Sequence, residues 1–598
     1  MLVAQASSGM DQEKMKEKVP TPTESEQPIR LAEFETLTEA LDYAAEGKTG
    51  YNFYSGRGEL LEALPYARLR EEAKRLAHRL LALSLPRGSS VAIIAHTDPL
   101  FVRVFFACQY AGLVPVPLPI ALQLSSAEAY IAQLRGLMKI AEAKVALAPK
   151  AFLPALSQAA EGLDLVLVGG IEDLERLPES DQPLNPLGPD ELAYIQFTSG
   201  STRFPRGVMV TQRAVLHNLR LIARYGVKRR EGDRAVSWLP FYHDMGLVGL
   251  VLATMAAQVS VDFFSPKDFI MRPGLWLKLI SQNRGTISFS PPFGYELAVL
   301  RLKDEDLNEL DLSSWRVAGV GAEMIRPQIL KRFATKFARC GFRQEAFLPC
   351  YGMAECTLAV SFTPLGRGMA VDQVDKESLK TGQKVVFREG GKDLVRCGRP
   401  LPELEIQIRD EKGRPLPEGH CGLLFVRGPS VMQGYRGDPE ATKEVLDEEG
   451  WLNTGDIAYL QEGEIVITGR AKDVIIINGR NIWPQDLEYI AESFPEVKSG
   501  NACAFAVPDE EGKDQAVVVV QSRVKGEEAE RLRREIAARI RSEFGIDSHV
   551  FLVPKNTIVR TTSGKPARSH TRRFCLEHGY IPRNFKKEGQ LRLAKTGG

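Results

Sequence analysis

YIQFTSGSTRFPRG, residues 194–207, passes from an apolar run typical of a strand into a loop of small hydroxyl and glycine residues. Such a loop can wrap backbone N–H groups and side-chain hydroxyls around phosphate oxygens, and Arg206 adds a cation. The stretch lacks the GK[ST] ending of a Walker A loop, which excludes an ordinary P-loop NTPase. It indicates a phosphate-binding loop on an α/β framework. Taken alone, it could also be a serine-rich turn between a strand and a helix.

Short apolar runs without polar alternation support that framework. They occupy residues 91–94, 145–148 and 165–168 and are separated by longer helical patterns. Strands that are apolar on both faces belong to parallel sheets covered by helices. The sequence therefore predicts an α/β fold, with a large N-terminal body of several subdomains in which helices cover mixed or parallel sheets.

The pattern changes near the C-terminus. Residues 474–477 and 516–520 are strand-like, and a helix is predicted over 527–544, where Leu532, Ile536, Ile540 and Phe544 recur every four residues before Gly545. A small α+β domain is expected over 471–598, separated from the body (29–470) by a turn at residues 468–470. Residues 1–28 are polar and predict a disordered leader.

Composition excludes several classes of protein. The 598 residues include 77 Lys and Arg against 76 Asp and Glu, a net charge of +1, so bulk charge does not favour a nucleic-acid partner. The eight cysteines form no CxxC pair and the eight histidines show no zinc spacing, which favours a cytoplasmic protein with reduced thiols. The apolar stretch 245–261 is short and lies between Asp244 and Asp262, so we expect a buried helix and no transmembrane segment.

Further motifs follow the loop along the chain. Tyr351 and Glu355 stand four positions apart, and Asp456 ends Asn-Thr-Gly-Asp, where a carboxylate just past a turn commonly holds ribose hydroxyls. Arg470 and Lys472 come next, and Lys565 ends Thr-Thr-Ser-Gly-Lys. Each motif is weak alone, since a single lysine in a Ser-Gly turn is more commonly a solvated loop residue.

The order and spacing of these motifs, over residues 34–574, resemble the adenylate-forming superfamily of acyl-CoA synthetases, nonribosomal-peptide adenylation domains and luciferases. Within it the chain most resembles the fatty acyl-AMP ligases. The stretches that carry this resemblance are ALDYAA (40–45), TGYNFY (49–54), STR (201–203) where acyl-CoA synthetases usually have Thr-Gly, WLPFYHDMGL (238–247), FSPPFGY (289–295) and GRNIWP (479–484).

The resemblance implies a role for each matching residue. Thr198, Ser199, Gly200, Ser201 and Thr202 would embrace the triphosphate, Gly321, Ala322, Glu323, Tyr351 and Gly352 would form the adenine pocket, and Asp456 with Arg470 would hold the ribose. Glu355 would help to place Mg²⁺. The C-terminal domain would swing about Lys472 and bring Lys565 to the reaction, and His243 would stand at the carboxylate end of the acyl pocket. Two residues depart from the pattern: Ala354 replaces a common threonine, and Arg206 replaces a common lysine.

The implied reaction agrees with elementary electrostatics. A fatty carboxylate must approach the α-phosphorus of ATP against like charge, so cations such as Lys565 and Mg²⁺ are needed. A carboxylate is already ionised at neutral pH and needs no general base. His243 is therefore expected to position or gate the substrate, with a satisfied core histidine as the alternative.

The function expected from the resemblance is ATP-dependent activation of a fatty acid to an acyl-adenylate with release of pyrophosphate. The acyl group would then pass to the phosphopantetheine thiol of an acyl carrier protein, or of a carrier domain in a polyketide or nonribosomal-peptide system. The alternatives are a fatty acyl-CoA ligase and a non-catalytic acyl- or nucleotide-binding module, against which Lys565, Glu355 and the phosphate loop argue. The long stretch between Glu355 and Gly398 resembles the fatty acyl-AMP ligases, which carry an insertion near here that is held to limit domain motion and to disfavour CoA. The sequence leaves chain length open, because Phe293 and Met245 could line a tunnel or fill a core.

Overall fold

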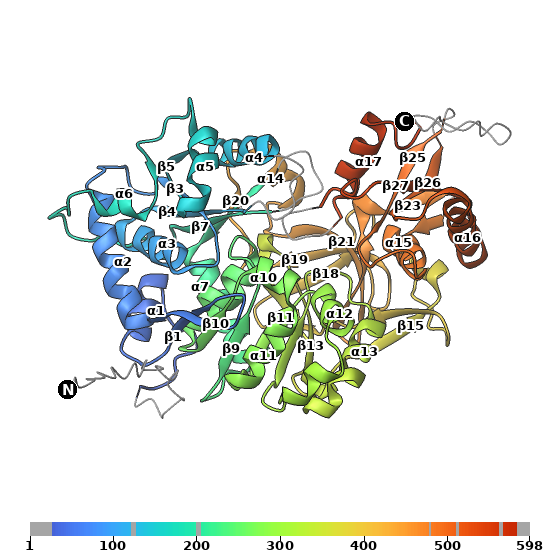
Figure 1. Ribbon diagram of the computed structural model, residues 1–598, viewed down its shortest axis with the longest axis horizontal. Helices are drawn as coiled ribbons and strands as arrows, with labels where there is room; N and C mark the ends of the chain where they lie inside the picture. The colour runs from blue at the N-terminus through green and yellow to red at the C-terminus, as the bar shows by residue number, and fades with distance from the viewer. Residues whose placement is uncertain are drawn as a thin grey trace, which may run out of the picture.

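The structure, a computed structural model, describes residues 27–120, 127–198, 205–477, 480–509, 513–560 and 566–582. Figure 1 shows a large body that contains most of the chain, with the last elements, in orange and red, grouped at one side of it. Of the predicted leader, only Gln27 and Pro28 are described. Gln27 donates to the Tyr43 carbonyl over 2.6 Å, and the Tyr43 hydroxyl donates to the Pro28 carbonyl over 2.8 Å.

The main sheet has nine strands in the order β17-β14-β13-β12-β11-β9-β10-β1-β2. Its strands are β17 Arg399–Pro400, β14 Ala359–Phe362, β13 Phe347–Gly352, β12 Val317–Val320, β11 Ile287–Ser290, β9 Arg234–Ser237, β10 Ser260–Phe263, β1 Gly50–Tyr54 and β2 Leu60–Pro65. The strands from β13 to β1 are parallel to their neighbours, and the pairs at either edge are antiparallel. Parallel strands end at one edge, so the segments after β9, β11, β12 and β13 meet there.

A second sheet contains the apolar runs predicted as strands. Its order is β4-β3-β5-β6, all parallel: β4 Val114–Leu118, β3 Ser90–Ile94, β5 Ala143–Leu147 and β6 Leu167–Gly169. Helix α3 (Pro99–Ala111) follows β3, with Asp98 accepting from the Phe101 amide at its start and Gly112 ending it at φ 72°. The predicted α/β class is confirmed.

Two antiparallel sheets complete the body. One has the order β20-β8-β7 (Gly434–Tyr435, Gly207–Thr211 and Leu192–Phe197), and the other the order β18-β19-β21-β22 (Glu405–Arg409, Gly422–Arg427, Leu452–Gln461 and Glu464–Arg470). The turn predicted at residues 468–470 is wrong, because these residues continue β22 and Arg470 pairs with Asp456 of β21. The chain turns one step later, in the 3₁₀ segment Ala471–Asp473.

Helices cover the sheets. They are α1 Leu37–Ala44, α2 Tyr66–Leu81, α4 Ala127–Ile140, α5 Leu153–Ala160, α6 Ile171–Glu175, α7 Gln212–Leu221, α10 Pro266–Met271, α11 Gly274–Gln282, α12 Pro292–Arg301, α13 Pro327–Phe337 and α14 Pro439–Val445. The apolar stretch 245–261 forms α8 (Asp244–Gly246), the π-helical segment Leu247–Leu252 and α9 (Ala253–Ala256), then enters β10. It is a buried core segment, as predicted. Within the described ranges, no helix combines the length and hydropathy that crossing a membrane requires.

The C-terminal elements have their own hydrophobic clusters. They are β23 Ile475–Ile477, β24 Arg480–Ile482, α15 Pro484–Glu492, β25 Ala502–Pro508, β26 Asp514–Gln521, α16 Gly526–Phe544, β27 Ser548–Val553 and α17 Arg568–Glu577. The predicted helix over 527–544 is confirmed: Leu532, Ile536 and Ile540 are fully buried, and Gly545 ends the helix at φ 62°.

The segment between Glu355 and Gly398 contains a hairpin of β15 (Val371–Val374) and β16 (Lys392–Val395). It lies beside the C-terminal elements (Figure 1). The Lys392 ammonium is 2.7 Å from the Asp486 carboxylate, and Lys376 stands over the Phe544 ring at 4.0 Å from its centroid. The hairpin therefore links the body to α15 and α16.

Candidate active site

One cavity of about 1180 Å³ opens at the carboxyl edge of the main sheet. Most of the predicted site residues that the structure describes line it: Thr198, His243, Ala322, Glu323, Tyr351, Gly352, Glu355, Asp456 and Arg470. Gly321 is buried and does not line the cavity, and Lys472 is exposed outside it. Ser199, Gly200, Ser201, Thr202 and Lys565 lie outside the described residues, although Thr198 and Pro566, their neighbours in the chain, both line the cavity.

Asp456 joins two predicted site residues. Its carboxylate accepts a 2.6 Å hydrogen bond from the Tyr351 hydroxyl and pairs with Arg470 Nε at 3.0 Å. Burial and the Asp456 charge raise the pKa of Tyr351, so the phenol remains a donor, and Asp456 raises the pKa of Arg470. Each Asp456 oxygen thus has one donor, and the remaining acceptor capacity faces the cavity, where hydroxyl groups of a ligand could bind.

Glu355 is half-buried, and its carboxylate accepts a hydrogen bond from the Tyr435 hydroxyl over 2.9 Å. Burial raises the pKa of Glu355, while the Tyr435 hydrogen bond and the charge of Arg470 oppose that rise. A divalent cation would offset the same desolvation, and Mg²⁺ is commonly held by one or two carboxylates together with phosphate oxygens and water. Glu355 therefore fits such an ion, although the described residues contain no group of three His, Cys, Asp or Glu side chains that could hold a metal without a phosphate ligand.

The backbone after β12 and β13 leaves little room for side chains. A Cβ at Gly321 would lie 2.9 Å from Cys350 Sγ, and one at Gly352 would lie 1.9 Å from the Leu358 carbonyl oxygen. Ala322 takes a positive φ of 67°. These close contacts leave Ala322 and Gly352, which have little or no side chain, on the cavity wall beside Tyr351.

The base of the predicted phosphate loop is a hairpin between β7 and β8, where the Thr198 amide donates to the Arg206 carbonyl over 3.0 Å. The Arg206 guanidinium stands over the Tyr435 ring at 4.9 Å. Tyr435 therefore contacts both Arg206 and Glu355. This links the loop that carries the predicted phosphate donors to the candidate magnesium ligand.

His243 caps α8 and lines the cavity between the polar residues and an apolar branch. Its Nδ1 lies 2.7 Å from an Asp244 carboxylate oxygen. The contact fixes the orientation of the ring, which suits a positioning residue.

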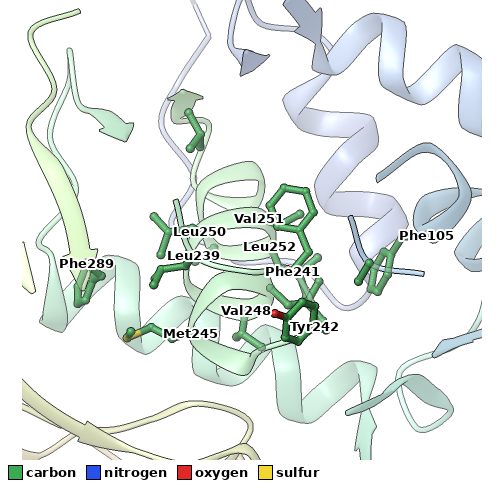
Figure 2. Packing of buried hydrophobic residues seen from close by; sticks show 14 of the residues in the cluster. Phe105, Leu239, Phe241, Tyr242, Met245, Val248, Leu250, Val251, Leu252 and Phe289 are labelled. Atoms are coloured by element: carbon green, nitrogen blue, oxygen red, sulfur yellow. The ribbon is translucent and has the colours of Figure 1, made fainter. Parts of the chain in front are cut away.

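The apolar branch runs along the helical segment that follows His243. Gly249, Ala253 and Ala257, four residues apart, line it on one side, and Phe289, Leu358 and Phe362 line it on the other. Figure 2 shows Met245 and Leu250 on the side of the helix that faces Phe289, with Tyr242 and Leu252 on the other side. Phe293 and Met245, which the sequence could not assign to a tunnel or a core, both line the cavity.

The arrangement agrees with comparisons to known proteins. The model of the AMP-binding enzyme family matches residues 44–436. The chain belongs to this family.

Its relatives are similar over nearly the whole chain. A Caulobacter vibrioides protein, provisionally named as an acyl-CoA synthetase, is 45% identical over 94% of this chain and 98% of its own length. The medium-chain-fatty-acid–[acyl-carrier-protein] ligase JamA of Moorena producens is 32% identical over 91% of this chain and 96% of its own. A solved structure from work on fatty acyl-adenylate ligases of E. coli and L. pneumophila is 46% identical, covers 93% of this chain and 100% of that one, and superposes with a TM-score of 0.88. The predicted membership of the adenylate-forming superfamily is confirmed.

The structure adds residues to this AMP-binding enzyme's site that the sequence did not single out. Tyr435 bonds Glu355 from 80 positions away, a separation that no local pattern reveals. Arg560 and Arg568 line the cavity from the C-terminal elements, and Arg568 bridges Glu488 and Asp473 over 2.8 and 2.7 Å. The small residues at positions 249, 253 and 257 show a helical spacing, but small residues at this spacing also occur in ordinary helix packing.

Proposed function

We propose that this AMP-binding enzyme activates a fatty acid with ATP to an acyl-adenylate, releases pyrophosphate, and passes the acyl group to the phosphopantetheine thiol of an acyl carrier protein. The observation that carries the proposal is the shape of the cavity, in which the Tyr351–Asp456–Arg470 cluster and Glu355 are continuous with a long apolar branch that begins at His243. An adenylate of a fatty acid has the same two parts, one polar and one apolar.

The nucleotide fits the polar end. The Asp456 carboxylate, which Tyr351 and Arg470 hold in place, would accept hydrogen bonds from the ribose hydroxyls. Arg470 supplies positive charge for phosphate, and the cavity wall at Ala322 and Gly352 would stack against the base. Thr198 to Thr202 would hold the phosphates that leave as pyrophosphate.

The acid enters with its carboxylate at His243. The ring, held by Asp244, would orient a carboxylate oxygen towards the α-phosphorus without taking a proton from it, since the acid is already ionised. The catalytic contribution of these residues is to hold two like-charged groups in line and to stabilise the charge that develops.

Two further groups complete the proposal. Mg²⁺, with Glu355 as the protein ligand, would neutralise charge on the phosphates. Lys565 would approach from the C-terminal unit, 471–598, by movement about the exposed Lys472 in the 3₁₀ segment that follows β22.

The two candidate functions, an acyl carrier protein ligase and an acyl-CoA ligase, differ in the thiol that accepts the acyl group. The ligase from Moorena producens favours a carrier protein, whereas the name of the relative from Caulobacter vibrioides favours CoA. The β15–β16 hairpin supports the carrier protein, because Lys392–Asp486 and Lys376–Phe544 tie the body to C-terminal elements that CoA-using relatives would need to reorient.

The test is exchange of radiolabelled pyrophosphate into ATP with a panel of saturated fatty acids, followed by separate addition of CoA and a holo acyl carrier protein. Acid-dependent exchange and acyl transfer to the carrier protein support the proposal. Transfer to CoA at a rate comparable to adenylate formation supports the alternative, and no exchange with any lipid contradicts both.

A further inference from the structure

The far end of the apolar branch lies at the opposite edge of the main sheet from His243. Val259 directly precedes β10, and Ile287 is the first residue of β11, so both mark the amino ends of parallel strands. Val227, Arg229 and Ala257 line the cavity at the same end. The branch therefore crosses the whole width of the sheet from the reaction centre.

The length of the branch follows from the helix beside it. At an α-helical rise of about 1.5 Å per residue, the twelve steps from Asp244 to Ala256 span at most about 18 Å, because the π-helical turn of Leu247–Leu252 holds more residues than an α-helical turn. An extended chain advances about 1.15 Å per bond, taken from a peptide backbone of three bonds per residue, so at most about 15 to 16 bonds fit along it. The branch has room for a fatty acid of medium to long chain.

Arg229 stands where that length ends. Its Nε donates to the Ala257 carbonyl over 3.0 Å, and a terminal nitrogen donates to the Gln258 carbonyl over 2.8 Å. These carbonyls lie directly after α9, and another nitrogen of the same guanidinium donates to the Arg230 carbonyl. The side chain thus spans from the loop after α7 to the end of α9, across the end of the branch.

The loop that carries Arg229 is held in place. The Val227 and Arg229 amides donate to the Ile222 and Ala223 carbonyls, each over 2.9 Å. A second arginine, Arg316, donates to the Val227 and Lys228 carbonyls over 2.9 and 3.2 Å. The backbone of Arg229 is therefore fixed, and its guanidinium cannot move aside without breaking its own bonds to the Ala257, Gln258 and Arg230 carbonyls.

The charged guanidinium of Arg229 also makes contact with a hydrocarbon chain unfavourable. Among the described residues, no carboxylate lies within salt-bridge distance of Arg229, and the nearby Asp233 is paired with Arg316 at 2.5 Å. A longer apolar chain would have to displace a cation that three backbone carbonyls hold, at the cost of those bonds and of the hydration of the charge.

We propose that Arg229 closes the acyl branch and sets the longest fatty acid that the enzyme activates. This inference rests on the proposed function, and it adds a residue that determines substrate specificity. The role is steric and electrostatic, and Arg229 takes no part in the bonds that form or break.

The test compares Arg229→Ala with the wild type in pyrophosphate exchange, using saturated acids from octanoate to eicosanoate. The expected result is a rise of at least about tenfold in the rate with acids longer than the wild-type optimum, relative to the rate with octanoate. Arg230→Ala is the matched control, because the Arg230 side chain is exposed and does not line the cavity. Its chain-length profile should equal that of the wild type.

A second variant fills the far end of the branch instead of opening it, and it remains informative if Arg229→Ala does not fold. Ala257→Leu adds volume beside Arg229 and should shift the preference to shorter acids, with octanoate still activated. If Arg229 serves only to cap α9, Arg229→Ala will slow all acids by one common factor. That result, or an unchanged profile in Ala257→Leu, overturns the inference. If the wild-type enzyme shows no pyrophosphate exchange with any of the acids, the proposed function itself is contradicted. The failure of the inference and the failure of the proposed function are therefore distinguishable.

Discussion

The two ends of the cavity are built on different principles. At the nucleotide end, charged and hydrogen-bonding side chains arrive from separate stretches of chain, as in the contacts of Tyr351 and Arg470 with Asp456. At the acyl end, one helical segment offers Gly249, Ala253 and Ala257, and the space exists because those side chains are small. The nucleotide end thus relies on charged and hydrogen-bonding side chains, whereas the acyl end relies on small residues along the branch and on a large one, Arg229, at its far end.

The comparison predicts different kinds of failure. Changes at the nucleotide end should slow adenylate formation with every acid. Changes at the acyl end should alter which acids react and leave the response to ATP unchanged.

The largest effect is expected for Lys565→Ala, which removes the cation that we propose acts at the nucleotide end. Acyl-AMP formation should fall by about 10³-fold or more, since charge stabilisation of the reaction centre is lost, while ATP binding remains largely intact. Quench-flow measurement of acyl-AMP and calorimetric titration of ATP check the two parts. Lys555→Ala, at an exposed lysine, is the control, and an unchanged yield of adenylate in Lys565→Ala would discard the assigned role.

The second-largest effect is expected from a substitution at the nucleotide end alone. Asp456→Asn keeps the shape of the side chain and removes the charge that pairs with Arg470, so adenylate formation should fall by about 10- to 100-fold. The factor should be the same for short and long acids. Asp190→Asn, at an exposed residue paired with Arg213, should leave the rate unchanged. If the fold-loss in rate differs between short and long acids, the two ends of the cavity do not have separate roles.

A smaller and selective effect is expected at the acyl end. Ala253→Leu narrows the branch about three quarters of the way along the helical segment from Asp244 to Ala256, and rates with long acids should fall at least about 10-fold relative to short ones. The KM for ATP should not change. Steady-state kinetics with paired acids measures both values, and an equal loss with all acids would show that Ala253 is ordinary core.

The smallest effect is expected at His217, a buried residue whose hydrogen bonds stabilise the structure near Glu355. His217 Nδ1 lies 2.9 Å from the Ser430 hydroxyl, and the Ser430 carbonyl accepts from Thr357, close to Glu355. His217→Ala should cost about 1–3 kcal/mol of unfolding free energy at neutral pH, because buried hydrogen bonds are lost.

The cost should depend on pH in one direction. Burial lowers the pKa of His217 and outweighs the opposing contact with Glu403. The stability from neutral His217 is therefore complete above about pH 6.5, and it is lost as pH falls, because the unfolded chain takes up a proton first. Denaturant unfolding at about pH 7.5 and about pH 5.5 should show a smaller difference between wild type and variant at the lower pH. A larger difference there would contradict the assigned sign.

Much of the fold was predictable because it depends on local patterns. The runs at 91–94 and 145–148 are apolar on both faces and became parallel strands, and the four-residue spacing of Leu532, Ile536 and Ile540 became α16. The turn expected at 468–470 was wrong because it was placed where one strand-like run gives way to a new pattern, whereas pairing of Arg470 with Asp456 extends the strand through these residues.

The site was predictable only where a motif marked it. Tyr351, Asp456 and Arg470 belong to recognisable stretches and do meet in space. Tyr435 and Arg229 belong to none, since a single tyrosine or arginine in a sequence carries no information about what it contacts after folding. Tertiary structure alone places Tyr435 on Glu355 and Arg229 on the carbonyls after α9.

The most direct test of the account is a crystal structure with a non-hydrolysable analogue of a long-chain acyl-adenylate. The account predicts ribose hydroxyls on Asp456, the acyl phosphate linkage beside His243, and the chain extended past Gly249 and Ala253 towards Ala257. An analogue whose hydrocarbon chain lies outside this branch, or whose ribose does not contact Asp456, would contradict it.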